Sequence, residues 1–211
     1  MICVEVVLSI KKHWESVYQT KDIKTVSWFQ PQETLSLKLI NDLSLNKSAQ
    51  IIDIGGGAST LVDELIFAGY ENLSVLDISQ AALILDRNRL GSDADKVTWI
   101  ESDILDANLP PTYYELWHDR AAFHFLTDPD HRDRYLTKAR TSISKGGYLL
   151  IATFANDGPE QCSGLPVVRY SEAKLIEEFT PSFEFVYSLK EDHLTPAQSV
   201  QKFIYCLFQR K

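Results

Sequence analysis

The sequence predicts an α/β fold in which helices cover both faces of a mostly parallel, seven-stranded sheet. Three observations lead to this prediction. Short apolar runs alternate with longer helical patterns from residue 49 onward, three glycines follow the first apolar run, and two long β-rich segments end the chain. Alternating strands and helices produce parallel strands joined by right-handed crossovers. We therefore expect a three-layer sandwich whose last two strands form an antiparallel hairpin.

The N-terminal segment is expected to be helical and to belong to the same domain. Trp14 and Tyr18 are spaced to share one helix face, and a second helix is expected from Pro31 to Leu43. We expect residues 1–48 to cover a ligand site and residues 49–211 to form the core of the fold.

The core elements follow in chain order. The apolar run at residues 49–54 is stopped by glycines, and the segment 148–154 has the composition of a strand at the centre of a sheet. Asp128 can cap a helix that begins with Pro129, because the first helical position needs no N–H donor. The expected strands cover 49–54, 73–76, 97–100, 114–117, 148–154, 183–190 and 200–209, and the expected helices cover 60–68, 80–90, 129–144 and 172–179.

The composition indicates a single cytoplasmic domain. With 211 residues and 45% hydrophobic content, the chain can bury roughly 70% of its unfolded surface. Its three cysteines, Cys3, Cys162 and Cys206, form no CxxC pair, so we expect neither disulfides nor a metal site. The 29 acidic and 21 basic residues give a formal charge of −8, which repels nucleic-acid phosphates, so we expect no nucleic-acid partner.

The first ten residues argue against a membrane partner. They are apolar but include Glu5, and the basic residues Lys11 and Lys12 follow the run instead of preceding it. A secretory signal has the opposite charge order, and so short a run cannot span a bilayer. We therefore expect neither a signal peptide nor a membrane anchor.

A glycine-rich turn, Asp53-x-Gly55-Gly56-Gly57, follows the first expected strand. Glycines at this place let a ligand approach the main-chain N–H groups at a helix start, which indicates nucleotide binding. The turn matches neither a dinucleotide fingerprint, because Thr60 replaces the last glycine, nor a P-loop, because no Gly-Lys-Ser/Thr follows. An acid two residues before the first glycine suits the ammonium group of an amino-acid moiety better than a pyrophosphate.

Two further aspartates follow the next strands. Asp77 ends the second strand at about the 20-residue spacing from Gly57 at which a carboxylate can bind ribose hydroxyls, although it could also cap the helix that starts near Ser79. Asp103 follows the third strand and could accept a hydrogen bond from an adenine amino group or simply shape a turn.

These motifs resemble those of class I methyltransferases, namely their motif I and the two motifs that follow it. The resemblance covers about residues 10–211, including the final hairpin, and implies S-adenosylmethionine as cofactor. It also implies which residues contact each part of the cofactor. The glycine turn, with Asp53, would hold the methionine part, Asp77 the ribose and Asp103 the adenine amine, while Ile78 and Ile104 would flank the adenine ring.

The fourth strand is apolar but ends in the polar residues His118-Asp119-Arg120. This end of the strand lies at the sheet edge that is expected to face the transferable methyl group. Methyl transfer needs a correctly placed, deprotonated nucleophile. Asp119, His118 or His124 could remove or orient a proton. Alternatively, Asp119 could pair with Arg120 or another neighbour and only shape the turn.

Parts of the chain are also similar to particular groups of methyltransferases. Asp119-Arg120 matches the Asp-Lys that opens an Asp-Lys-Gly-Thr segment in a group of protein-lysine methyltransferases, although Ala121, Ala122 and His124 replace later residues of that segment. The segments around Trp14 and Trp28 are similar to the aromatic entry of the same group, which adds Trp28 to the expected cofactor site.

The expected acceptor is therefore a protein lysine or amine. One alternative is a small N-, S- or O-nucleophile, because the loop at 156–166 is similar in placement to the substrate loop of thiopurine-type methyltransferases. The other alternative is a regulator that binds S-adenosylmethionine without catalysis.

Overall fold

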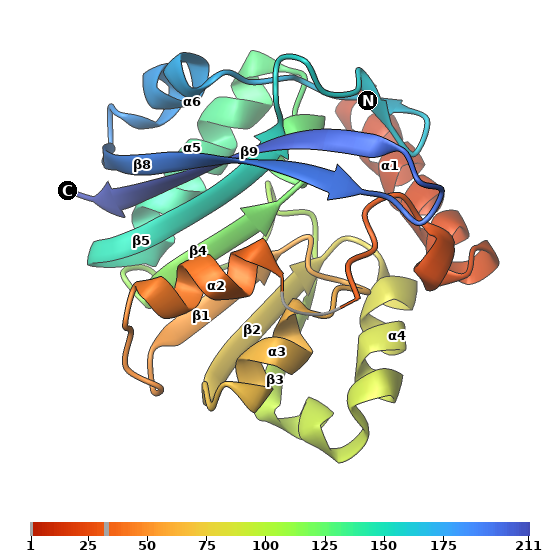
Figure 1. Ribbon diagram of the computed structural model, residues 1–211, viewed down its shortest axis with the longest axis horizontal. Helices are drawn as coiled ribbons and strands as arrows, with labels where there is room; N and C mark the ends of the chain where they lie inside the picture. The colour runs from red at the N-terminus through yellow and green to blue at the C-terminus, as the bar shows by residue number, and fades with distance from the viewer. Residues whose placement is uncertain (1, 32–33) are drawn as a thin grey trace.

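A computed structural model describes residues 2–31 and 34–211 and confirms the three-layer α/β sandwich. The seven strands of the sheet lie in the order β3-β2-β1-β4-β5-β9-β8 (Figure 1). The first five strands run parallel, and β9 is antiparallel to both β5 and β8. The strands of this sheet are β1 (Gln50–Ile54), β2 (Asn72–Asp77), β3 (Val97–Glu101), β4 (Tyr114–Arg120), β5 (Ile143–Phe154), β8 (Phe183–Leu194) and β9 (Val200–Arg210).

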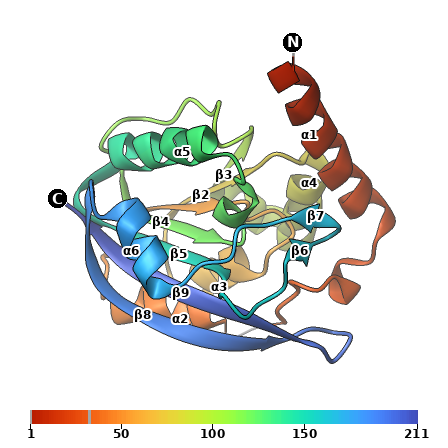
Figure 2. The ribbon, with the colours of Figure 1, turned by 90° about the horizontal axis from the view of Figure 1, so that it is seen from above.

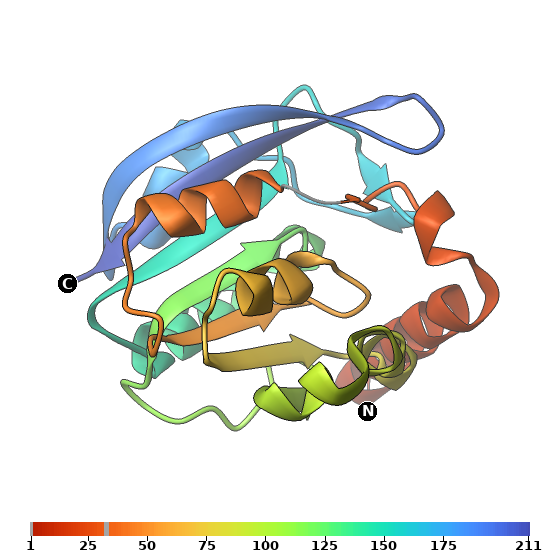
Figure 3. The same ribbon diagram turned by 60° about the horizontal axis from the view of Figure 1, so that its bottom comes forward.

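Helices cover both faces of the sheet and one end of it. Leu39, Leu61 and Leu83 come from three different helices, α2, α3 and α4, and belong to one buried cluster on one face. Tyr135 and Phe179 from α5 and α6 pack on the opposite face (Figure 3). α1 lies beyond the carboxyl ends of the strands, beside α4 (Figure 2). The helices are α1 (Ile2–Thr20), α2 (Leu35–Asp42), α3 (Leu61–Phe67), α4 (Gln80–Leu90), α5 (Pro129–Ser142) and α6 (Glu172–Phe179), with short 3-10 turns η1 (Ile23–Thr25), η2 (Gly91–Lys96) and η3 (Phe123–Phe125).

The centre of the sheet is apolar on both faces. Four consecutive residues of β5, Leu149 to Ala152, are completely buried. A parallel strand with helices on both sides has no solvent-facing positions, so its sequence is a continuous apolar run instead of an alternating one. This composition is the reason why the strand could be predicted.

The topology places a crevice at the carboxyl ends of β1 and β4. The chain leaves β1 towards β2 and β3 and returns to the other side of β1 as β4. Ligands of open α/β sheets bind where the strand order reverses in this way.

Several element boundaries differ from the prediction. α2 begins at Leu35 and not at Pro31, because the Thr34 hydroxyl caps it by accepting the Leu37 N–H at 3.1 Å. The helix expected at 129–144 ends at Ser142, and β5 begins directly after it and includes Gly146, which takes a φ of +75° beside a shift in the β4–β5 register. β4 extends to Arg120, because both of its edges are paired over most of its length.

The expected irregular loop at 156–166 contains a small two-stranded sheet, formed by β6 (Gln161–Cys162) and β7 (Leu165–Pro166). Among residues 2–31 and 34–211, no helix combines the length and the apolar character needed to cross a bilayer.

Candidate active site

A cavity of about 570 Å³ opens at the carboxyl ends of β1, β2 and β4. Its volume lies within the range of small-molecule and cofactor sites. All the residues that the sequence predicts for cofactor binding line this cavity. They are Trp28, Asp53, Gly55, Gly56, Gly57, Asp77, Ile78, Asp103 and Ile104.

The glycine turn packs directly against two carboxylates. Gly55 has a φ of +66°, which favours glycine. A Cβ atom on Gly56 would lie 2.3 Å from Asp53 Oδ2, and one on Gly57 would lie 2.8 Å from Asp77 Oδ2. The absence of side chains therefore lets both carboxylates reach the turn and face the cavity. This cradle fits a ligand with hydroxyl and ammonium donors.

Asp77 is buried and supports the glycine turn. Its Oδ2 accepts a hydrogen bond from the Gly57 N–H at 3.1 Å, and its Oδ1 accepts one from the Ser79 N–H at 2.8 Å. Burial raises the pKa of Asp77 to about 6. The cap of α4 is Ser79, whose hydroxyl accepts the Ala82 N–H, so the alternative that Asp77 caps this helix is wrong.

Asp103 shapes a turn and also lines the cavity. Its Oδ1 accepts the Leu105 N–H at 2.8 Å, and Ile78 and Ile104 lie in the same wall. Both expected roles of Asp103 are therefore compatible with its position.

The alternation of β4 separates its polar residues. His118 and Arg120 line the cavity, whereas Asp119, between them, points to the opposite face of the sheet. His118 Nδ1 lies 2.6 Å from Asp53 Oδ1, and its Nε2 lies 2.8 Å from the Ser36 hydroxyl.

Asp119 is completely buried beneath α5. Its carboxylate accepts the N–H groups of Ala122 and Phe123 and the hydroxyl of Tyr135, the last at 2.6 Å. Burial raises its pKa to about 6, although the Tyr135 hydrogen bond opposes this shift. Asp119 is not among the residues that line the cavity. Its partners are Tyr135 and the η3 backbone, and not Arg120.

His124 also lies outside the cavity lining. It is completely buried, and the Phe154 N–H donates to its Nδ1 at 3.4 Å. Burial and the positive charge of Arg120 lower its pKa to about 3, so the imidazole is neutral at physiological pH. Of the three predicted proton-transfer residues, the structure brings only His118 into the cavity.

Arg120 is held by its own partners. Its Nε donates to the Tyr205 hydroxyl at 2.9 Å, its Nη2 lies 3.5 Å from Glu191, and its guanidinium lies 4.3 Å from the centre of the Phe203 ring. A positive charge is thereby fixed at one wall of the cavity.

Four aromatic side chains meet at the same cavity, and we call them the aromatic wall: Trp14, Tyr18, Trp28 and Phe125. The Trp14 ring lies 5.6 Å from Trp28 and 5.3 Å from Phe125, and Tyr18 lies 6.2 Å from Trp28, measured between ring centres. All four line the cavity. Such distances are typical of favourable edge-to-face aromatic pairs.

The first helix is anchored over the site by a carboxylate. Glu15 of α1 accepts the N–H groups of Gln80 and Ala81, at 2.6 and 3.1 Å, at the start of α4. An acidic group at a helix N-terminus satisfies donors that have no partner within the helix.

Sequence reasoning missed several lining residues, including Ser36, Phe125 and Arg120. Phe125 and Arg120 belong to the segment 118–125, which contains the candidate proton-transfer residues, but the sequence does not tell which side chains of this segment face the cavity. Ser36 gave no signal, because serine near a helix start is common.

Cys162 lines the cavity from β6, and burial raises the pKa of its thiol to about 11. The thiol is therefore protonated at neutral pH and a poor nucleophile.

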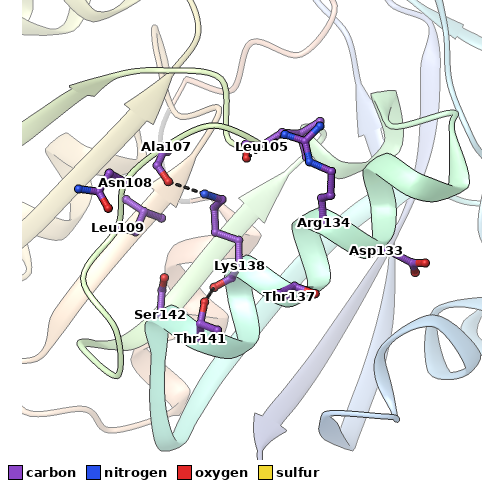
Figure 4. Close-up of a pocket in the computed structure, with 10 residues that line it drawn as sticks. All are labelled: Leu105, Ala107, Asn108, Leu109, Asp133, Arg134, Thr137, Lys138, Thr141 and Ser142. Atoms are coloured by element: carbon purple, nitrogen blue, oxygen red, sulfur yellow. Dashed lines mark hydrogen bonds between the residues drawn. The ribbon is translucent and has the colours of Figure 1, made fainter. Parts of the chain in front are cut away.

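A second cavity, of about 420 Å³, lies between α5 and the segment that follows β3 (Figure 4). Its two basic side chains are already paired within the chain. The Lys138 ammonium donates to the Ala107 carbonyl, and Arg134 pairs with Asp106 at 2.8 Å. It shares only Leu105 with the larger cavity.

Comparison with known proteins agrees with this geometry. Residues 51–147 match the family described as methyltransferase domain. The chain is 26% identical over 196 residues to EEF1A lysine methyltransferase 2 of Danio rerio, an alignment that covers 86% of this chain and 78% of that protein. It is 22% identical over 149 residues to eEF1A lysine and N-terminal methyltransferase of Bos taurus, covering 68% of this chain and 21% of that protein.

Solved structures share the fold. 1,6-Didemethyltoxoflavin-N1-methyltransferase of Burkholderia thailandensis, crystallised with 1,6-didemethyltoxoflavin and S-adenosylhomocysteine, superposes with a TM-score of 0.72 at 15% identity. The superposition covers 98% of this chain and 89% of that one. The methyltransferase domain and the relatives named methyltransferases show that the protein is a methyltransferase, and its fold is the one found in solved S-adenosylmethionine-dependent methyltransferases.

Proposed function

We propose that this enzyme methylates an amine nitrogen and that its acceptor is a protein lysine side chain. The observation that carries the proposal is the aromatic wall, which lines the cavity beside the cofactor residues. Aromatic faces attract ammonium groups that lie within about 6 Å of the ring centre. A lysine side chain combines such a group with an apolar stem that can pack between the rings.

The two kinds of relatives add support, because their names place lysine methylation on eEF1A. These relatives are 26% and 22% identical to this chain, and eEF1A is therefore the first protein to test as acceptor.

Each predicted residue has a proposed role around the cofactor. Bound S-adenosylmethionine supplies an electrophilic methyl group on a positively charged sulfur. We place Asp53 at the ammonium group of its amino-acid part, Asp77 at the ribose hydroxyls and Asp103 at the adenine amine. The adenine ring is placed between Ile78 and Ile104, and Trp28 covers the site together with α1.

The lysine ammonium must lose a proton to solvent water before its nitrogen can attack. Arg120 lines the cavity, and although Glu191 at 3.5 Å offsets part of its charge, a neighbouring positive charge lowers the pKa of an ammonium group. Arg120 therefore favours the neutral, nucleophilic amine. We propose no proton transfer by Asp119 or His124, because their partners lie inside the protein core.

A small-molecule acceptor is the second candidate, and the cover over the cavity favours it. α1 and the β6–β7 segment both contribute to the lining, so a flat heterocycle could stack on the aromatic wall without any protein surface entering. The toxoflavin N-methyltransferase shows that the fold accommodates such a ligand.

Labelled methyl groups decide between the two acceptors. The enzyme is incubated with methyl-labelled S-adenosylmethionine and either purified eEF1A or a desalted cell extract supplemented with its small-molecule fraction. We expect label in protein and methyl-lysine after hydrolysis. Label confined to the small-molecule fraction would contradict the lysine proposal. Gly56→Ala is the matched control, because its Cβ would collide with Asp53 and block the cofactor turn.

A further inference from the structure

A chain of three buried polar side chains runs along one wall of the cavity. Asp53, His118 and Ser36 are 4%, 3% and 1% exposed, and all three line the cavity. The carboxylate Oδ1 lies 2.6 Å from the imidazole Nδ1, and the imidazole Nε2 lies 2.8 Å from the serine hydroxyl. Three different elements contribute, since these residues come from β1, β4 and α2.

The fold fixes this arrangement at each position. Asp53 and His118 are register partners on neighbouring parallel strands, so their side chains emerge side by side on one face of the sheet. α2 covers this face, and its Thr34 cap places Ser36 in the first helical turn above the imidazole.

The carboxylate fixes the direction of the first hydrogen bond in this chain. A carboxylate can only accept, so Nδ1 carries the proton that it shares with Asp53. The other ring nitrogen, Nε2, lies within hydrogen-bond distance of the Ser36 hydroxyl, which can donate or accept. The separation of 2.6 Å is short for an N–H···O contact, as expected where the acceptor is an ionised carboxylate, and it holds the carboxylate firmly.

The second oxygen of Asp53 remains available. No residue in the described part of the chain donates a hydrogen bond to Oδ2, which faces the backbone of Gly56 at the cavity. A carboxylate with one oxygen fixed and the other directed at the glycine turn is prepared for a cationic donor.

We propose that His118 and Ser36 are positioning residues, which orient Asp53 so that its free oxygen binds the ammonium group of the cofactor. This inference rests on the placement of Asp53 proposed above and is independent of the acceptor. His118 acts through Asp53 and transfers no proton to or from the acceptor.

Two ligands that differ in a single group test the inference. S-adenosylhomocysteine carries the ammonium group. Its analogue 5′-deoxy-5′-(3-carboxypropylthio)adenosine keeps the carboxylate but lacks the ammonium group. Dissociation constants of both are measured by titration calorimetry for the wild-type enzyme and for His118→Leu, His118→Asn and Ser36→Ala. Thermal melting of each variant confirms that it is folded.

We expect His118→Leu to weaken the binding of S-adenosylhomocysteine about tenfold, the equivalent of about 1.4 kcal/mol. The affinity for the deamino ligand should stay unchanged. His118→Asn should restore much of the loss, because its amide nitrogen can take the place of Nδ1. Ser36→Ala should cause a smaller loss with the same selectivity for the ammonium group.

If His118→Leu weakens the binding of both ligands equally, the inference is overturned, because the result would show general damage to the cavity. Unchanged binding of both ligands would overturn it as well. If the wild-type enzyme binds the two ligands equally well, the proposed placement of Asp53 is wrong and the inference falls with it. Should His118→Leu not fold, Ser36→Ala decides by the same comparison.

Discussion

At the scale of single residues, the alternation of β4 decides which side chains can act at the cavity. His118 and Arg120 face it, and Asp119 faces the core beneath α5. The sequence indicated a polar cluster at this strand end. It could not indicate the direction of each side chain, because a shift of one residue in the strand exchanges the two faces.

Asp119 is expected to serve stability and not turnover. Asp119→Ala leaves two backbone N–H groups and the Tyr135 hydroxyl without their acceptor, so the free energy of unfolding should fall by about 2–3 kcal/mol. Turnover per folded molecule should stay near normal. Denaturant unfolding and initial rates on the same preparation measure both, and Tyr135→Phe is the matched control for the lost hydroxyl contact. A stable variant with strongly reduced turnover would contradict this assignment.

Asp77 is expected to make cofactor binding depend on pH. Burial raises its pKa to about 6, and hydroxyl donors bind the ionised form. The affinity for S-adenosylhomocysteine should therefore be full well above pH 6, be about halved at the pKa of about 6, and fall below it by up to about tenfold per pH unit. Calorimetric titrations between pH 5 and pH 8 measure this dependence, which Asp77→Asn should abolish. A wild-type profile as flat as that of Asp77→Asn would rule out the proposed ribose contact.

At the scale of elements, α1 turns an open crevice into a covered cavity. The spacing of Trp14 and Tyr18 predicted a helix with one aromatic face. Phe125 could not be predicted as a packing partner of that face, because it reaches the face from a segment that is distant in sequence. The start of α5 at Pro129 was predicted well, since its cap by Asp128 is a local feature.

Glu15 is expected to hold α1 in place over the site. Glu15→Gln removes the charge that interacts with the start of α4, a contribution of about 0.3–1 kcal/mol. Amide hydrogen exchange should become faster in α1, with little change in the sheet. Lys12→Gln alters a charge on the exposed side of the same helix and serves as control. Equal exchange rates in both variants would show that Glu15 is not an anchor.

The aromatic wall is expected to bind the acceptor more than the cofactor. Trp14→Leu removes one aromatic face, and the KM for the acceptor should rise roughly tenfold, as expected for the loss of a desolvated cation–π contact. The dissociation constant of S-adenosylhomocysteine should change much less. Tyr113→Leu, a substitution at an exposed tyrosine outside the cavity, provides the comparison. A larger effect on the cofactor than on the acceptor would reassign the wall to cofactor binding.

At the scale of the whole molecule, the alternating pattern sufficed to predict the fold, because parallel α/β topology follows from the order of elements. The glycine turn and the aspartates after β2 and β3 could be predicted as one site for the same reason, since the carboxyl ends of neighbouring strands meet. Ser36 and Arg120 could not be assigned, because the position of Ser36 depends on how α2 packs against the sheet and that of Arg120 depends on its partners on β8 and β9.

Amide hydrogen exchange of the whole chain, with and without saturating S-adenosylhomocysteine, tests most directly whether this cavity is the cofactor site. We expect protection at the glycine turn, at residues 77–80, at residues 102–105 and in α1, because these segments line one cavity. Protection confined to α5 and the second cavity, or no protection at the glycine turn, would contradict the account.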